Sequence, residues 1–462
     1  MDHTKVVTIQ RLSKKGLGIG FCEDLSKDIE IRGVYPTEKV LCTLTKKKKG
    51  AHQGVAIEII EESKSRCEKK CVHFPTCGGC SWQTLSYDEQ LRVKQNHVEN
   101  LFSPFIDRSM IKQIKGMEFP FEFRNKMEWS FYDEKEGLGK LGLIEAGSKG
   151  RVFDVKECYL CPEWMVECLQ AVRNWWEKNS HVRAYHILRK TGTLHLLTMR
   201  EAKNTKEKMV ILTVSGEPSS FRREELESFK KTIIDVRGSD VSLFLAIKHI
   251  QEGRATSINE MLLHGKDHIL ETLNVRLNEE DKKFSIKISP ASFFQPNTKQ
   301  AELIYSLALQ MLANQSLDVV LDLYSGTGTL GIAFSSLANK VIAVELNPYA
   351  TFDAAVNMEM NHVTNMTMIQ GDVKEVIEKN LIQEQVDLVI VDPPRSGLGE
   401  KVCQQIQAFK PKLILYISCN PTTQAEDMKF LVGSGYKIDL IQPVDQFAHS
   451  VHLENIVVLK KI

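Results

Sequence analysis

Apolar and polar residues alternate with a period of two over residues 4–60, and glycine-containing turns interrupt the alternation. The pattern predicts short strands at residues 6–12, 16–21, 39–45 and 54–60. Short strands joined by turns are typical of a small barrel, and a basic hairpin tip fits a barrel that binds oligonucleotides. We therefore expect a small β-barrel domain over residues 1–62; a small β-domain without a ligand is the alternative.

A different pattern begins at about residue 298, where buried-strand runs alternate with segments of helical periodicity. The runs cover residues 316–324, 340–346, 366–372, 386–394 and 413–420. Strands that alternate with helices form a parallel sheet with helices on both faces. We therefore expect an α/β, Rossmann-like domain over residues 291–462. Residues 63–290 mix strand-like and helix-like stretches, which indicates a central α+β domain whose topology the sequence does not predict.

The composition is that of a globular protein. The chain has 462 residues, 42% hydrophobic and 26% charged, and its length suggests about two to four domains. No apolar run approaches the length of a bilayer span, and the N-terminal residues lack a charged-then-apolar signal layout. We expect a cytoplasmic protein, in which the eleven cysteines stay reduced because the cytosol disfavours disulfides.

Net charge is uneven along the chain. Residues 1–70 contain 15 Lys and Arg against 10 Asp and Glu, which leaves +5 there and −4 over the rest of a chain with +1 overall. The run Lys46–Lys49 is either a solvated hairpin tip or a patch that contacts phosphates. Charge alone does not decide between these interpretations.

A glycine-rich turn follows the first C-terminal strand, in the stretch DLYSGTG. Gly326 and Gly328 let the backbone turn tightly and approach a ligand closely. Glu345, Asp372 and Asp392 close later strands, and the carboxyl ends of neighbouring parallel strands face one crevice. Such acids suit a ligand with ribose hydroxyls, an adenine amine and a cationic centre, so we expect S-adenosylmethionine. A helix cap is the alternative role for any one of them.

Cys419 lies at the carboxyl end of the run 413–420, in the stretch SCNPTT, where α/β sheets keep their active sites. A helix N-terminus or nearby cations can activate a thiolate there. Uracil is a suitable target, because a thiolate that adds to carbon 6 makes carbon 5 nucleophilic enough to take a methyl group. A base must then remove the proton from carbon 5, and Glu454, on the last strand-forming stretch, supplies a carboxylate.

Cysteines crowd into residues 67–80, and Cys71, Cys77 and Cys80 are separated by five and then two residues. Glycines between the last two permit the tight backbone that surrounds a thiolate-bound metal centre. Thiolates suit both zinc and iron–sulfur clusters. No second closely spaced pair or His-x-x-x-His stretch completes a standard zinc layout.

The stretches SFFQPN, DLYSGTG, DPPRSG, SCNPTT and DQFAHSVHLE, in this order, resemble the RNA uridine-5 methyltransferases, which make 5-methyluridine in transfer and ribosomal RNA. The resemblance extends from residue 4 to residue 460. It implies an RNA (uracil-5-)-methyltransferase with Cys419 as nucleophile and Glu454 as base. It also implies an RNA-binding barrel, an RNA-binding central domain, and a cofactor site formed by Gln295, Tyr324, Glu345, Asp372 and Asp392.

The cysteine spacing, followed by Trp82-Gln83 and a helix, resembles the iron–sulfur branch of that family. The branch uses a distant fourth cysteine, which implies a [4Fe-4S] cluster held by Cys71, Cys77, Cys80 and Cys158. Cys161 and Cys67 stay open as rivals of Cys158. The branch also favours 23S ribosomal RNA over transfer RNA as substrate. We expect no membrane association, and nothing in the sequence implies a protein partner.

The chain departs from the family pattern at Ala448, Ser450 and Leu453, where Pro, Thr and Val are usual, and these positions bear on target preference. Two other functions stay open: a non-catalytic RNA-binding or assembly protein and a cytosine-5 methyltransferase. The complete set of Cys419, Glu454 and cofactor acids favours an enzyme, and the stretch SCNP together with Glu454 favours uracil over cytosine. Candidate RNA contacts, each equally a candidate surface charge, are Lys14, Lys15, Arg124 and Lys126.

Overall fold

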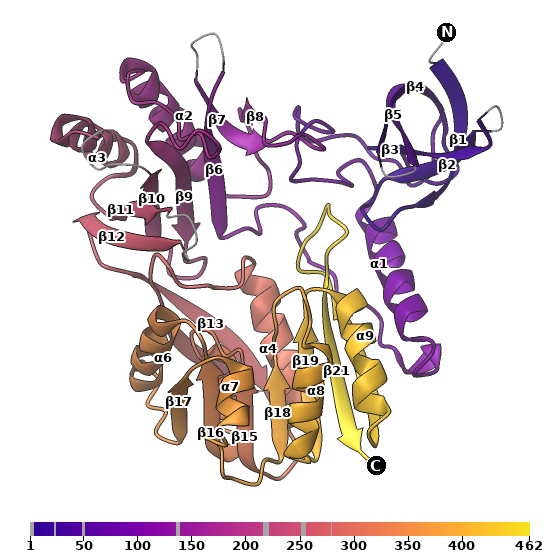
Figure 1. Ribbon diagram of the computed structural model, residues 1–462, viewed down its shortest axis with the longest axis vertical. Helices are drawn as coiled ribbons and strands as arrows, with labels where there is room; N and C mark the ends of the chain where they lie inside the picture. The colour runs from indigo at the N-terminus through magenta and orange to yellow at the C-terminus, as the bar shows by residue number, and fades with distance from the viewer. Residues whose placement is uncertain are drawn as a thin grey trace.

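A computed structural model describes residues 4–22, 25–48, 51–134, 139–215, 221–250, 256–278 and 280–462. The N-terminal barrel and a central sheet domain lie above a C-terminal sheet domain in the view of Figure 1. Within these ranges no helix is long and apolar enough to cross a bilayer. The domain boundaries predicted at residues 62 and 290 stay predictions.

The N-terminal strands form a closed barrel with the order β1-β2-β3-β5-β4. The strands are β1 (Thr4–Leu12), β2 (Gly18–Cys22), β3 (Lys27–Ile31), β4 (Lys39–Lys48) and β5 (Ala51–Glu61). Alternate residues such as Val7, Ile9, Ile29 and Ile31 point inward and are buried together. The predicted barrel is confirmed, and β3 is a strand that the sequence did not predict. The side chains of the lysine run 46–49 lie outside the described residues.

Helix α1 (Tyr87–Phe102) follows the cysteine-rich segment and precedes a short 3-10 helix, η2 (Arg108–Met110). The buried face of α1 is unusually polar, because Gln90, Lys94 and Gln95 are buried beside the apolar side chains. Buried polar groups need partners. Lys94 finds its partners in the loop between the last two strands of the chain, residues 445–453, which we call the β20–β21 loop, and Gln90 bonds both to this loop and to the backbone oxygens of Trp82 and Leu85.

The central domain is built on a seven-stranded sheet with the order β12-β11-β10-β9-β6-β7-β8. Helices α2 and α3 share a core with this sheet, formed by side chains that include Trp129, Leu169, Leu212 and Phe229. The elements are β6 (Lys126–Asp133), β7 (Gly139–Ile144), β8 (Val152–Asp154), α2 (Glu163–Lys178), β9 (Leu194–Glu201), β10 (Lys208–Ser215), α3 (Arg223–Arg237), β11 (Val241–His249) and β12 (Ser257–His264).

A hairpin of β13 (Ile269–Leu277) and β14 (Glu280–Ile288) leads into the C-terminal sheet, which has the order β17-β16-β15-β18-β19-β21-β20. Its strands are β15 (Leu317–Leu323), β16 (Ala338–Glu345), β17 (Met366–Gln370), β18 (Leu388–Val391), β19 (Leu413–Ser418), β20 (Tyr436–Val444) and β21 (Glu454–Lys461). Strands β15 to β19 are parallel, whereas β21 is antiparallel to both of its neighbours.

The C-terminal sheet has a core on each face, as expected for buried strands between two helix layers. The helices are α4 (Thr298–Leu312), α5 (Thr329–Phe334), α6 (Pro348–Met360), α7 (Val373–Glu378), α8 (Gly399–Ala408) and α9 (Pro421–Val432). This arrangement confirms the predicted parallel sheet. The strand order reverses between β15 and β18, and α/β sheets bind ligands at the carboxyl ends of strands beside such a reversal.

Candidate active site

A small cavity lies at the carboxyl ends of β15 and β18, beside the reversal of strand order. Its volume is about 80 Å³, and its lining includes Gln295, Tyr324, Gly326 and Asp392. Tyr324 and Gly326 have φ angles of 63° and 57°, so the chain turns sharply as it leaves β15. The fold therefore brings together Gln295, Tyr324 and Asp392 from the predicted cofactor set.

Glu345 supports the same turn from the end of β16. Its carboxylate accepts hydrogen bonds from the backbone N–H groups of Gly326 at 2.9 Å and Asn347 at 2.7 Å. Asp372 caps helix α7 through the N–H of Lys374 at 2.9 Å, which is the role named above as the alternative for such an acid. Asp372 is not among the residues that line the cavity. Burial, and then the charge of Asp372, raise the pKa of the cavity residue Tyr324 to about 12.

Two carboxyl groups beside the cavity have strongly raised pKa values. Burial raises the pKa of Asp392 to about 7 and that of Asp322, on β15, to about 8. One oxygen of Asp322 accepts a hydrogen bond from the N–H of Gly331 at 2.9 Å, and the other has no hydrogen-bond partner among the described residues. A buried unpaired acceptor is costly unless a ligand donates to it. The pair suits a ligand that brings hydrogen-bond donors and positive charge.

Cys419 is partly buried between the end of β19 and the start of α9. It lines a second cavity, of about 170 Å³, together with Arg395, His452 and Lys14 of the barrel. The side chain of Asn420 donates to the backbone oxygen of Arg395 at 2.9 Å, which ties the DPPRSG turn to the cysteine turn. The fold thus places a cation beside the thiol and opens the site toward the N-terminal domain.

The predicted nucleophile, Cys419, and the predicted base, Glu454, belong to the same site, where the charge of Glu454 affects the pKa of the thiol. Burial, followed by the charges of Glu454 and Asp392, raises the pKa of the Cys419 thiol to about 11, and Arg395 acts in the opposite direction. Glu454 is only 2% exposed. Burial and Asp392 raise its pKa well above the ordinary value. Each carboxylate is therefore close enough to affect the proton of the thiol.

Arg395 and Gln446 are two site residues to which the sequence assigned no role. The Nε2 group of Gln446 donates to Oε1 of Gln295 at 2.6 Å and lies 3.5 Å from Oε1 of Glu454. Both residues lie inside stretches that carry the resemblance, DPPRSG and DQFAHSVHLE. The motifs therefore indicated this part of the chain, but they did not indicate what either side chain does.

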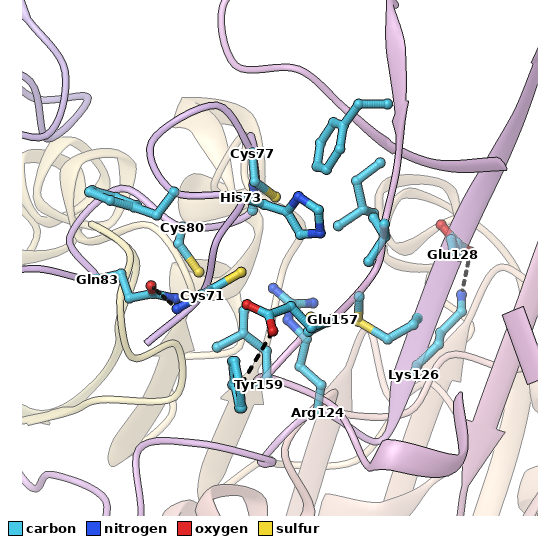
Figure 2. Close-up of a pocket in the computed structure, with 18 of the residues that line it drawn as sticks. Cys71, His73, Cys77, Cys80, Gln83, Arg124, Lys126, Glu128, Glu157 and Tyr159 are labelled. Carbon is cyan, nitrogen blue, oxygen red and sulfur yellow. Dashed lines mark hydrogen bonds and ion pairs between the residues drawn. The ribbon is translucent and has the colours of Figure 1, made fainter. Parts of the chain in front are cut away.

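A third cavity, of about 310 Å³, is lined by Cys71, Cys77, Cys80 and Cys158 together. Figure 2 shows the first three of these around the cavity, with Arg124 and Lys126 among the other lining side chains. Burial raises the pKa of the thiols of Cys71, Cys77 and Cys80. In the part of the chain that the structure describes, no group of three or more His, Cys, Asp or Glu side chains is arranged to hold a single metal ion.

Of the two rival cysteines, Cys161 lies against Cys158, and the two thiols form a hydrogen bond. Cys161 is 1% exposed and belongs to the apolar core of the central domain, and its Sγ faces the backbone oxygen of Cys158 at 3.7 Å. Cys67 is exposed. Neither residue is among those that line the cysteine cavity.

The candidate RNA contacts are spread over two of these sites. Lys14 lines the cavity of Cys419, and Lys15 is exposed beside it in sequence. Arg124 and Lys126 line the cysteine cavity, and Lys126 forms an ion pair with Glu128 at 2.7 Å.

Comparisons with known proteins agree over almost the whole chain. The family model for tRNA (uracil-5-)-methyltransferase matches residues 86–462. A relative from Protochlamydia amoebophila, named as an uncharacterized RNA methyltransferase, is 41% identical over 441 residues, which cover 93% of this chain and 99% of the relative. A relative of the same name from Clostridium tetani is 32% identical and covers 98% and 97%.

A solved structure has the same overall fold. It is the tRNA (uracil-54, C5)-methyltransferase of Pyrococcus abyssi in complex with S-adenosyl-L-homocysteine, with a TM-score of 0.73 and 25% identity. The match covers 98% of this chain and 99% of that one, which confirms the predicted fold class. Because the family model covers well over half of the chain and relatives match it nearly end to end, this protein is an enzyme of the tRNA (uracil-5-)-methyltransferase family.

Proposed function

We propose that this enzyme methylates carbon 5 of a uridine in RNA, with S-adenosylmethionine as methyl donor and a covalent bond between Cys419 and carbon 6 as intermediate. The observation that carries the proposal is the meeting of Cys419, Glu454 and Asp392 in one site, where both carboxylates raise the pKa of the thiol. A nucleophile and a proton acceptor beside a crevice lined by candidate cofactor residues are the parts that this reaction needs.

In the proposed reaction the Cys419 thiolate forms a bond to carbon 6, and the electron pair of the C5–C6 double bond moves to carbon 5. Carbon 5 then takes the methyl group, and the electron pair of the broken sulfur–methyl bond stays on the sulfur of the leaving S-adenosylhomocysteine. Glu454 removes the proton from carbon 5, the double bond re-forms and the thiolate leaves. Arg395 favours the charged form of the thiol.

We assign the methyl donor to Gln295, Tyr324, Glu345, Asp372 and Asp392. Gln295, Tyr324 and Asp392 line the cavity beside β15, and Glu345 holds the turn at Gly326. The methyl donor carries a cationic sulfonium, and a bound cation would favour the charged form of the Asp392 and Asp322 carboxyl groups, whose pKa values are raised by burial. The unpaired oxygen of Asp322 is a further acceptor for a donor group of this ligand.

We further propose that Cys71, Cys77, Cys80 and Cys158 hold a [4Fe-4S] cluster. The support is that these four thiols line one cavity, and that thiolates are the ligands such clusters use. The cysteine spacing that resembles the iron–sulfur branch of the family favours a cluster over a single zinc ion. The cluster would cross-link the segment 71–80 to residue 158, and methyl transfer needs no redox step from it.

For the substrate we propose 23S ribosomal RNA, because the cysteine spacing resembles the iron–sulfur branch of the family. Transfer RNA is the second candidate. It is favoured by the name of the matching family and by the similarity to the Pyrococcus abyssi enzyme, which acts on uracil 54 of transfer RNA.

The test is methyl transfer from labelled S-adenosylmethionine to ribosomal RNA and transfer RNA that lack 5-methyluridine, followed by digestion and identification of the nucleoside. We expect 5-methyluridine in ribosomal RNA only, and none with Cys419→Ala. Label in transfer RNA alone would keep the reaction and replace the substrate. Methylation that persists with Cys419→Ala would contradict the covalent route.

A further inference from the structure

The predicted base is joined to the cofactor side of the site by a buried chain of amides. The Nε2 group of Gln295 donates to Oδ2 of Asp392 at 3.3 Å. The Nε2 group of Gln446 donates to Oε1 of Gln295 at 2.6 Å and approaches Oε1 of Glu454 at 3.5 Å. Gln446 is fully buried, with 0% of its surface exposed. It therefore lies between the residue that would remove the proton and a residue that would hold the methyl donor.

The direction of these amides is set by the carboxylates at the two ends. When these two carboxylates are ionised they only accept hydrogen bonds, and Gln295 then turns its NH₂ group toward Asp392 and its oxygen toward Gln446. Gln446 then faces acceptors on both sides, Oε1 of Gln295 and Oε1 of Glu454, and its NH₂ group is the part that can satisfy both. In this orientation the Oε1 atom of Gln446 has no hydrogen-bond partner among the described residues.

Buried interactions also hold the backbone at Asp445 and Gln446 in place. The preceding residue, Asp445, forms a buried ion pair with Lys94 at 2.6 Å. Its backbone oxygen accepts a hydrogen bond from Nε2 of Gln300 at 2.6 Å. The backbone oxygen of Gln446 itself lies 3.4 Å from Nδ2 of Asn297, which donates to it. The amide of Gln446 is therefore presented to Glu454 from a rigid support.

Glu454 has little else to orient it. Its Oε2 atom has no hydrogen-bond partner among the described residues, and Arg395 acts on it through charge. We propose that Gln446 is a positioning residue, whose NH₂ group holds the Glu454 carboxylate ready to take the proton from carbon 5. This inference rests on the proposed function and adds a residue that acts through the base, with no contact to the RNA.

The proposal predicts which step fails when the amide is lost. In Gln446→Met the side chain keeps a similar length but donates no hydrogen bond. Nucleophilic addition and methyl transfer use Cys419 and the methyl donor, so they should continue. Proton removal should slow by about tenfold to a hundredfold, below the full effect of a general base. The methylated RNA should then stay attached to Cys419.

The experiment uses the full chain with RNA that carries tritium at carbon 5 of uridine. Attachment is followed as a protein–RNA band that survives denaturing electrophoresis, and proton removal is followed as released tritium. Glu454→Gln serves as the reference for a lost base. Gln442→Met is the matched control, because Gln442 is also buried, and its Nε2 donates to backbone oxygens, that of Gln113 among them, outside this network.

We expect Gln446→Met to accumulate the attached RNA and to release tritium slowly, as Glu454→Gln does, with a change in the KM for S-adenosylmethionine that is small beside the loss of tritium release. Gln442→Met should resemble the unsubstituted enzyme in all three measurements. Should Gln446→Met not fold, Gln446→Asn, which keeps the amide but shortens its reach, is expected to show the same accumulation.

Other outcomes overturn the inference and separate it from the proposed function. If Glu454→Gln accumulates attached RNA while the Gln446 variants release tritium at the normal rate, the positioning role falls and the proposed function stands. The positioning role also falls, and the proposed function also stands, if the Gln446 variants lose protein–RNA attachment and tritium release to the same extent. If neither Glu454→Gln nor the unsubstituted enzyme ever forms an attachment through Cys419, the covalent mechanism falls, and the inference falls with it.

Discussion

At the scale of single residues, the site is a group of carboxylates held in a poorly solvated environment. The cost of burying a charged carboxylate is clearest at Asp322, because burial raises its pKa to about 8 from an ordinary value of 3.8. The folded state therefore holds a proton that the unfolded state releases between these two values. Stability consequently falls as pH rises through this window.

We predict that Asp322→Asn stabilises the protein selectively at alkaline pH. The amide oxygen can still accept the hydrogen bond from Gly331, and no charge is buried. Between pH 5 and pH 9 the free energy of unfolding of the variant should gain more than about 1 kcal/mol relative to the unsubstituted protein, since one pKa unit corresponds to about 1.4 kcal/mol. Urea unfolding at three pH values measures this. The exposed Asp318 on the same strand gives the control Asp318→Asn, and parallel pH curves for both variants would refute the prediction.

Cys419 gives a second prediction at this scale, for the enzyme without RNA. Its pKa of about 11 keeps the thiol protonated at neutral pH, so alkylation by iodoacetamide should quicken about tenfold per pH unit up to pH 10. Arg395→Met should slow the alkylation of Cys419 and Glu454→Gln should quicken it, because the two side chains shift the pKa in opposite directions. Peptide mass spectrometry measures the rate at this cysteine alone. A plateau below pH 9 would show that the thiol is already charged there.

At the scale of elements, the sequence predicted those whose pattern is local. The runs that became β15 to β19 are buried on both faces and read as continuous apolar stretches, so their parallel sheet could be predicted. The strand order of the central sheet could not, because β6 pairs with β9 across long intervening segments. Gln446 was missed for the same reason: its partner Gln295 lies 151 residues away. Periodicity does not encode such a contact.

Helix α1 is one of the elements that hold the β20–β21 loop in place. Lys94 and Asp445, 1% and 0% exposed, form an ion pair at 2.6 Å, and the hydroxyl of Tyr87 donates to the same carboxylate at 2.9 Å. Lys94 also donates to the backbone oxygen of Phe447 at 3.0 Å. In Figure 1 the yellow loop before β21 rises toward the part of the molecule that contains α1.

We predict that Lys94→Met destabilises the protein by about 3–5 kcal/mol, because the Asp445 charge would stay buried without its partner. The double variant Lys94→Met/Asp445→Asn should recover part of this loss, since the unpaired charge is gone. Arg92→Met is the control on the same helix: its ion pair with Glu89 is exposed and should contribute less than about 1 kcal/mol. Urea unfolding midpoints give the comparison. A double variant less stable than Lys94→Met would contradict the assigned cause.

At the scale of the whole molecule, the cysteine segment and the active site are joined through backbone hydrogen bonds. Directly after Cys80, the N–H groups of Ser81 and Trp82 donate to the backbone oxygen of His449 at 2.8 and 3.1 Å. His449 belongs to the β20–β21 loop, which ends at Glu454. Whatever holds Cys80 in place therefore also holds the loop that leads to the predicted base.

This connection predicts how loss of the proposed cluster would spread. Cys158→Ser removes one proposed ligand and should abolish iron binding of about four atoms per chain, whereas Cys161→Ser, in the apolar core, should keep the iron.

Without the cross-link the segment 71–82 loses a constraint. Hydrogen exchange should therefore quicken there and in the β20–β21 loop, and stay unchanged in β15 and β18, which make no such contact in the described structure. Mass spectrometry of the two variants, purified without oxygen, measures iron retention and exchange in parallel. Faster exchange confined to residues 71–82 would show that the cysteine segment does not hold the β20–β21 loop. Loss of iron from Cys161→Ser, with iron kept by Cys158→Ser, would make Cys161 the fourth ligand in place of Cys158.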